Sequence, residues 1–143
     1  MSLFKNLTRQ SHWLIRLSIG ATFLYHGIPK LYHPAMMPFP PVMTILIGLL
    51  EVGGVLLLLT GGFGKDLATR VAGGIHSAIM IGAILIMKIP YGFNSATVFV
   101  PNGFDNTMVL TGWEFELLIL VVSLNFLITG NAQPAVTEES SMN

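Results

Sequence analysis

The stretch VMTILIGLLEVGGVLLLLT, residues 42–60, decides the fold of this chain. A bilayer is crossed by about 20 helical residues at a rise of about 1.5 Å each, so this apolar run has the length of a membrane span. Its one charged residue, Glu51, lies near the middle. A carboxylate at that depth is unfavourable by roughly 2.5–3.5 kcal/mol unless a partner or a proton neutralises it. Glu51 is therefore the first candidate functional residue.

The composition of the whole chain is typical of a membrane protein. Of its 143 residues, 52% are hydrophobic and only 10% are charged, whereas soluble domains carry about a quarter charged residues. Three other stretches also have the length of a span. The sequence therefore predicts an all-α fold, a transmembrane antiparallel four-helix bundle, with spans at about 13–32, 42–60, 67–87 and 113–129.

The segments around these spans set the domain organisation. We expect a cytoplasmic N-terminal segment at 1–12, a four-span membrane domain at 13–130 and a disordered cytoplasmic tail at 131–143. The long outer connection, 88–112, contains VFVP at 98–101 followed by Asn-Gly, which indicates a small turn or hairpin lying against the membrane surface. No room is left for a soluble catalytic domain.

The basic residues predict the orientation. Four spans put both ends of the chain on the same side of the membrane. That side would carry four basic residues and the opposite side two, so the positive-inside rule predicts a cell inner (cytoplasmic) membrane protein with both termini in the cytoplasm. The two groups are Lys5, Arg9, Lys65 and Arg70 on the inner side, and Lys30 and Lys88 on the outer side.

Charge and cysteine content exclude several functions. The chain has seven basic and seven acidic residues, so it lacks the basic surface that nucleic-acid binding requires. It has no cysteine, which excludes disulfides, thiol nucleophiles, covalently attached haem and cysteine-ligated iron–sulfur clusters. The histidines form no i,i+4 pair and no Glu-x-x-His motif, so we expect no metal site. Any redox cofactor must be noncovalent.

Helical periodicity predicts which side chains face the interior. At 100° per residue, one face of the first span and one face of the second collect the charged and small residues, and small residues let neighbouring helices approach closely. Both Arg16 and Glu51 therefore point inward. The first face consists of Arg16, Gly20, Phe23, Gly27 and Lys30, with His26 at its edge, and the second of Thr44, Gly48, Glu51, Gly54 and Val55.

The fourth span has glutamates on opposite sides. Glu114 shares a face with Leu118, Val121 and Asn125, whereas Glu116 shares the other side with Ser123. We assign Glu114 and Asn125 to the interior and Glu116 to the headgroup zone or to an oligomer contact.

The third span presents His76 on a face with Gly73, Met80 and Ala83. The charged interior residues then suggest two sets of partners. Arg16 or His76 would lie against Glu51, and Lys30 or His26 against Glu114.

Several motifs, in this order, resemble the DoxX family over nearly all of residues 13–130. They are Arg16-x3-Gly20-x2-Phe23-x2-His26-Gly27-x2-Lys30, then Glu51-x-Gly53-Gly54 with its leucine run and Gly61, a mid-span His76, and Gly112-Trp113-Glu114 leading to Leu127-x-Thr129-Gly130. The resemblance implies a four-helix membrane protein related to the membrane subunit of thiosulfate:quinone oxidoreductase. It also implies an association with redox enzymes.

The resulting hypothesis is a subunit of a quinone-linked oxidoreductase or redox-protection complex. A quinone ring needs hydrogen-bond donors at its carbonyls and a proton donor during reduction. The candidate catalytic residues are Glu51, His26 and Glu114, and the candidate quinone contacts are His26, Lys30, Phe23, Trp113 and His76. Alternatively, Arg16, Glu51, Lys30 and Glu114 form structural ion pairs that only hold the helices in register.

Two other functions fit the same residues. One is a non-catalytic membrane scaffold or assembly partner, which would bind redox-enzyme subunits or a second copy of this chain. The other is transport of a small solute or a proton, since intramembrane charges also mark such pathways. In every case the lipid bilayer is the first partner.

Overall fold

The computed structural model describes residues 2–94, 98–102, 106–110 and 112–131. Four α-helices make up most of this part: α1 (Ser2–Tyr32), α2 (Pro41–Gly61), α3 (Asp66–Gly82) and α4 (Glu114–Thr129). They occupy the four stretches predicted to be helical, and the all-helical class is confirmed. Helix α1 begins well before the predicted position 13. Of the expected tail, only Asn131 lies within the described residues.

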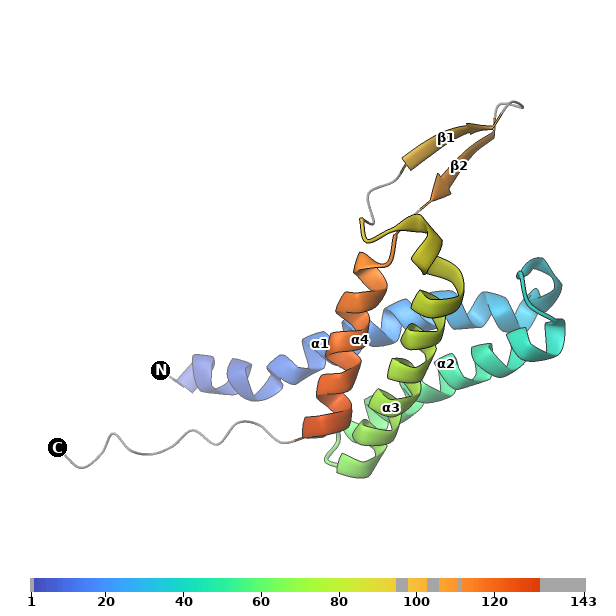
Figure 1. Cartoon of the computed structure of the whole chain (residues 1–143). Coiled ribbons are helices and arrows are strands. Elements are labelled where there is room, and N and C mark those ends of the chain that lie inside the picture. The colour runs from blue at the N-terminus through green and yellow to red at the C-terminus, as the bar shows by residue number, and fades with distance from the viewer. Residues whose placement is uncertain (1, 95–97, 103–105, 111, 132–143) are drawn as a thin grey trace.

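The long connection after α3 is ordered in three parts. Helix α3 continues through a π-helical turn, Ala83–Lys88, and a short 3-10 turn, Ile89–Tyr91. A hairpin follows, in which strand β1 (Val98–Asn102) pairs antiparallel with β2 (Asn106–Leu110). The predicted hairpin is thus present, and Figure 1 shows it extending away from the helices. Its position relative to a membrane stays a prediction.

Helices α1 and α2 form an antiparallel hairpin around a proline-rich turn. Close contacts join Gly20 to Val55, Gly27 to Gly48, and Trp13 to Gly62, and in each pair the two residue numbers add up to 75. This constant sum is the register of an antiparallel pair. A Cβ on Gly48 would lie 3.0 Å from the carbonyl oxygen of Gly27, so glycine is needed for this close approach.

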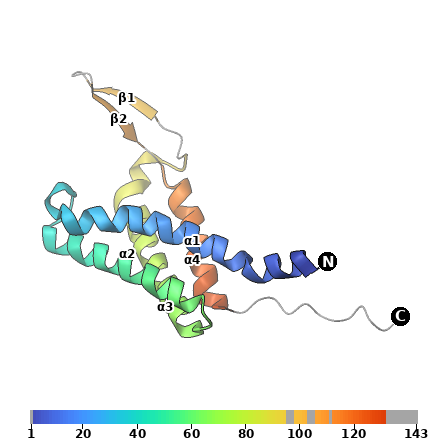
Figure 2. The same ribbon diagram turned by 180° about the vertical axis from the view of Figure 1, so that it is seen from behind.

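Helices α3 and α4 form a second antiparallel hairpin, which packs on the first through α2 and α3. The contact within it is also close, because a Cβ on Gly73 would lie 2.7 Å from the carbonyl oxygen of Ser123. Figures 1 and 2 show the two hairpins crossing each other. The helices are therefore antiparallel neighbours in pairs, as predicted, but the pairs are crossed rather than aligned along one bundle axis.

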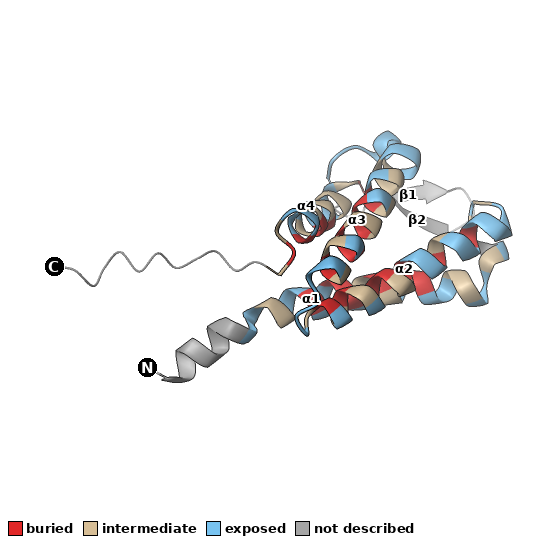
Figure 3. Cartoon of the chain, turned by 90° about the horizontal axis from the view of Figure 1, so that it is seen from below, coloured by how far each residue is buried: buried red, intermediate tan, exposed pale blue. Residues whose placement is uncertain are grey.

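The core is small and the helices expose much apolar surface. Figure 3 shows the buried positions gathered where α1, α2 and α3 meet. Large side chains are exposed on every helix, including Leu14 at 73%, Leu56 at 61%, Leu67 at 74% and Leu118 at 62%. Two helical segments, Pro41–Gly61 and Asp66–Tyr91, are long and apolar enough to cross a membrane. With 16 residues, α4 is about 24 Å long.

Candidate functional site

Glu51 forms an ion pair with Lys30. The Lys30 ammonium donates to both carboxylate oxygens, at 2.7 Å each. The Glu51 side chain is only 3% exposed, whereas the Lys30 side chain is 20% exposed. The carboxylate is therefore enclosed between α1 and α2, and the ammonium lies between it and the surface.

This pairing corrects the partners predicted for Glu51 and Lys30. Arg16 contacts other groups, described below, and Lys30 binds Glu51 instead of Glu114. The reason is the register of the first hairpin. A residue-number sum near 75 places Arg16 opposite Leu58, about two helical turns of α2 from Glu51. Glu51 itself lies against Gly27, one turn from Lys30.

His26 lies beside this pair on the exposed side of α1. It is within electrostatic range of Lys30 on its own helix, of Lys88 after α3 and of Glu116 on α4. Its ring also meets Tyr25 edge-on, with centroids 5.4 Å apart. We call the Lys30–Glu51 pair, together with His26 one helical turn before Lys30 on α1, the Glu51 group.

His76 is the centre of the contact between the two hairpins. It is fully buried and stacks on Phe23, with ring centroids 3.8 Å apart and an interplanar angle of 10°. A Cβ on Gly54 would lie 2.5 Å from its Nε2 atom. Neither ring nitrogen has a hydrogen bond of standard geometry among the described residues, although the ring lies near the backbone of Glu51. Two of the candidate quinone contacts, His76 and Phe23, therefore stack on each other inside the protein, where no ligand reaches them without a rearrangement.

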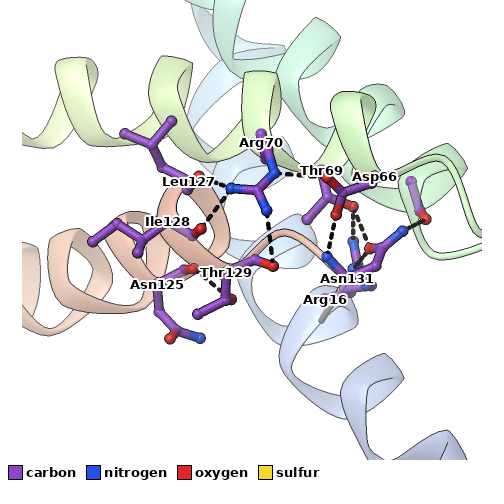
Figure 4. A network of polar contacts seen from close by, with 10 residues as sticks. Arg16, Asp66, Thr69, Arg70, Asn125, Leu127, Ile128, Thr129 and Asn131 are labelled. Atoms are coloured by element: carbon purple, nitrogen blue, oxygen red, sulfur yellow. Dashed lines mark hydrogen bonds and ion pairs between the residues drawn. The ribbon is translucent and has the colours of Figure 1, made fainter. Parts of the chain in front are cut away.

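Arg16 ties all four helices together at the other end of the molecule (Figure 4). Its guanidinium donates to the carbonyl oxygen of Leu58 on α2 at 2.7 Å, to Oγ1 of Thr69 on α3 at 3.1 Å and to Oδ1 of Asn131 after α4 at 2.7 Å. It also lies 5.0 Å from the centroid of the Phe126 ring. Arg16 is only 2% exposed, and these neutral acceptors provide the hydrogen bonds that a buried charged group requires.

Asn131 is the second centre of this network. Its amide donates to the carbonyl oxygen of Gly61 at 2.9 Å, and its backbone N–H donates to Oδ1 of Asp66 at 2.7 Å. Arg70 donates to Oδ2 of Asp66 at 2.6 Å and to three carbonyl oxygens at the end of α4, those of Leu127, Ile128 and Thr129. Sequence reasoning missed Thr69, inside α3, and Asn131, after α4, because a single neutral polar residue gives no signal in the sequence pattern.

One more contact of Arg16 indicates the protonation state of His12. Its Nε atom donates to Nδ1 of His12 at 3.4 Å. Burial, and then the neighbouring Arg16 charge, lower the pKa of His12 below its ordinary value. His12 is therefore neutral at pH 7 and able to accept this hydrogen bond.

The predicted inner face of α4 is wrong. Glu114 and Asn125 are exposed, while Ile119, Ser123 and Phe126 are buried. Glu116 points toward the protein, and its Oε1 atom lies 3.3 Å from Nζ of Lys88. Apolar residues occur all round α4, so periodicity did not select a face, and the small Ser123 is the residue that fits against Gly73.

Trp113 lies at the N-terminal end of α4 and packs edge-on against Phe93, with centroids 4.8 Å apart. Its backbone N–H donates to the carbonyl oxygen of Gly92 at 3.1 Å. Trp113, a candidate quinone contact, therefore packs against the connection that precedes α4.

Two further features of the described residues bear on the site. No three histidine or acidic side chains among them are placed to hold a metal ion. A groove of about 400 Å³ runs along α2 next to Ile75 of α3, lined by Leu49, Gly53, Leu56 and other residues. At 100° per residue, this side of α2 is roughly opposite to Glu51. The groove offers no polar chemistry.

Comparisons with known proteins gave one relevant similarity. No family model matches the chain, and no solved structure matches it. A Bacillus subtilis (strain 168) protein named "Putative oxidoreductase CatD" is 28% identical over 126 residues, which cover 82% of this chain and 78% of that protein. The chain is thus similar, over most of its length, to a protein named as an oxidoreductase.

Proposed function

We propose that this chain is a DoxX-like, multi-pass protein of the cell inner membrane and serves as the membrane subunit of a quinone-linked oxidoreductase. The observation that carries the proposal is the Lys30–Glu51 pair with His26 beside it. An ionisable group within an apolar helix is by default a functional candidate. The similarity to a protein named as an oxidoreductase supports the same class of function.

The membrane location is supported by the surface. Soluble monomers rarely expose apolar patches larger than a few hundred Å², whereas large apolar side chains are exposed along all four helices here. Lipid is the solvent that suits such a surface. Four spans in one bilayer put both termini on the same side as the Arg16 end of the molecule, and the positive-inside rule assigns that side to the cytoplasm.

The absence of cysteine from the sequence makes this location directly testable. Single cysteines placed at Lys65, in the α2–α3 loop, and at Asn94, after α3, are reacted with a membrane-impermeant maleimide in intact cells and in inverted vesicles. We expect Asn94→Cys to react only in cells and Lys65→Cys only in inverted vesicles. Reaction of both from the same side contradicts the proposed topology.

The chemistry of the Glu51 group suits a quinone ring. The Lys30 ammonium is partly exposed and His26 is exposed, so both side chains are available to donate hydrogen bonds to quinone carbonyls. Glu51 lies behind them, bonded to Lys30 at 2.7 Å. A carboxylate in that position stabilises the cation and offers a place to hold a proton during reduction of the ring.

A binding titration tests this assignment. Purified protein in lipid nanodiscs is titrated with the short-chain quinone ubiquinone-1. We expect saturable binding that weakens about tenfold or more in His26→Ala and Glu51→Gln. His33→Ala removes an exposed histidine from the turn after α1 and serves as the matched control, which should bind as the unmodified protein does. Absence of binding, or equal binding by all variants, contradicts a quinone site here.

A non-catalytic scaffold is the second candidate. The observation that favours it is the β1–β2 hairpin, which extends beyond the helices in Figure 1 and offers an attachment surface for a redox-enzyme subunit. In this case, isolation from gently solubilised membranes yields a complex that is lost when residues 98–110 are replaced by a short glycine–serine linker. Quinone binding by the purified chain alone would argue for the first proposal.

A further inference from the structure

The N-terminal part of α1 extends past the end of its partner helix. In the register of the first hairpin, Trp13 lies against Gly62, directly after the last residue of α2. Residues 2–12 are still helical, so they continue α1 beyond the end of α2 by about 16 Å. Figures 1 and 2 show this end of α1 projecting from the other helices. We call residues 2–12 the α1 extension.

The α1 extension continues two sides of the helix. At 100° per residue, positions 5 and 9 each fall about 20° from Arg16, and positions 3 and 7 each fall about 20° from Leu14. Arg16 is 2% exposed and Leu14 is 73% exposed, so the first side faces the protein further along α1 and the second is its outer, apolar side. The first side carries Lys5 and Arg9, and the second carries Leu3 and Leu7. The α1 extension is therefore amphipathic, with a basic side.

The α2–α3 loop adds a cation and an aromatic surface at the base of the α1 extension. Phe63 is 80% exposed and meets the Trp13 ring edge-on, with centroids 5.0 Å apart. Lys65 is exposed and forms no ion pair with another residue that the structure describes. Aromatic rings are enriched in membrane proteins at the level of the lipid headgroups. The loop therefore has the composition of a segment at a membrane surface.

The charges at this end of the molecule favour an anionic partner. Asp66, the acidic residue next to Lys65, already accepts hydrogen bonds from Arg70 and from the backbone N–H of Asn131. A helix with a basic side and an apolar side is typical of segments that lie in the headgroup layer. The cytoplasmic leaflet, on which the proposed topology places this end, carries the negative surface potential that attracts such segments.

We infer that the α1 extension and the α2–α3 loop form a binding surface for the headgroups of anionic phospholipids. The apolar side with Leu3 and Leu7 enters the boundary of the acyl chains. Lys5, Arg9 and Lys65 then lie at the level of the lipid phosphates and pair with them. The inference goes beyond a quinone site and rests only on the membrane location in the proposed function.

Tryptophan fluorescence measures which lipids surround this surface. The chain has two tryptophans, so Trp113→Phe leaves Trp13, at the base of the α1 extension, as the single reporter. The protein is placed in vesicles of equal parts phosphatidylcholine and phosphatidylglycerol, in which one lipid or the other carries bromine on its upper acyl carbons and quenches nearby indole rings. A lysine or arginine near an anionic surface is equivalent to about fivefold in affinity. We therefore expect phosphatidylglycerol to be enriched about fivefold or more around Trp13.

Replacement of the three cations by glutamine, in Lys5→Gln, Arg9→Gln and Lys65→Gln combined, should reduce this enrichment to about twofold or less. Lys5→Arg combined with Lys65→Arg keeps the charges and is the matched control, which should keep the enrichment. Trp13→Phe leaves Trp113, at the N-terminal end of α4, as the reporter. An enrichment around Trp113 as large as that around Trp13 would overturn a binding surface at the α1 extension.

The remaining outcomes separate this inference from the proposed function. If neither lipid quenches either tryptophan, the membrane location fails and this inference fails with it. If both lipids quench Trp13 equally, or if the triple variant keeps the full enrichment, only this inference is overturned. Salt screens the attraction between exposed charges, so the enrichment around Trp13 should also decrease from low to high salt. An enrichment that salt does not change would contradict the inference even where the triple variant does not fold.

Discussion

Replacing Lys30 with methionine should destabilise the protein far more than replacing Glu51 with glutamine. Lys30→Met leaves a carboxylate that is 3% exposed without the ammonium group that it binds, and breaking one side of a buried pair costs about 3–5 kcal/mol. Glu51→Gln leaves a lysine that is already 20% exposed and whose long stem lets the ammonium reach the surface. The second change should cost about 1–2 kcal/mol.

The assay is thermal unfolding of the purified protein in nanodiscs, followed by the helical circular dichroism signal. For a chain of this size, 1 kcal/mol corresponds to roughly 3 °C, so we expect the unfolding midpoint to fall by about 10 °C or more in Lys30→Met and by about 5 °C in Glu51→Gln. Lys65→Met, in an exposed loop position, is the control and should have no measurable effect. The reasoning is refuted if Lys30→Met unfolds at the same temperature as this control.

A double variant separates a structural ion pair from a functional one. Lys30→Met combined with Glu51→Leu removes both charges at similar volume, and such replacements are often neutral or stabilising. We therefore expect the unfolding midpoint to recover to within a few degrees of that of the unmodified protein. Loss of ubiquinone-1 binding in this stable variant supports a role in the site. Unchanged binding assigns the pair to packing alone.

The contacts elsewhere in the molecule lead to three further predictions. Gly54→Ala places a Cβ 2.5 Å from Nε2 of His76 and should destabilise the folded protein by about 1–3 kcal/mol. Gly82→Ala meets nothing within 4 Å and should stabilise the protein by up to about 1 kcal/mol. Equal unfolding midpoints for the two variants would contradict the crossed packing of α2 on α3. Asn131→Ala leaves the buried Arg16 without one of its acceptors and should lower the free energy of unfolding by about 2–3 kcal/mol in the same thermal assay. An unchanged melting curve would contradict a stabilising role of the Arg16–Asn131 contact. His76→Leu removes a stacked ring, which is destabilising, and two buried nitrogens without hydrogen bonds of standard geometry, which is stabilising by a similar amount. The variant should therefore melt within a few degrees of the unmodified protein and bind ubiquinone-1 equally well. Loss of binding would instead place His76 in the quinone site.

Much of the fold follows from apolar runs and small residues. The helix positions could be predicted because four long apolar stretches are separated by proline and glycine. The inner faces of α1 and α2 were also predicted correctly, since Arg16, Glu51 and the glycines around them are buried as expected. In both helices the polar and small residues gather on one side, so the helical period indicates a face.

The failures have physical causes in particular residues. The partner of Glu51 depends on the axial register of α1 on α2, which the length of the proline-rich turn and the Gly27–Gly48 contact determine. The helical period indicates on which side of a helix a residue lies, but it does not indicate how far one helix is shifted along another. On α4 the apolar residues lie on all sides, so the choice of Glu114 over Glu116 had no basis in the pattern. The crossing of the two hairpins depends on Gly54 fitting against His76, which requires both helices in place.

The most direct test of a quinone site is photolabelling of the protein in nanodiscs with an azido derivative of ubiquinone, followed by peptide mapping. The Glu51 group predicts labels in the segment from His26 to Lys30 that excess ubiquinone-1 suppresses. Labels confined to the groove along α2 between Gly53 and Thr60, or labelling that excess ubiquinone-1 does not suppress, would contradict a quinone site at this group.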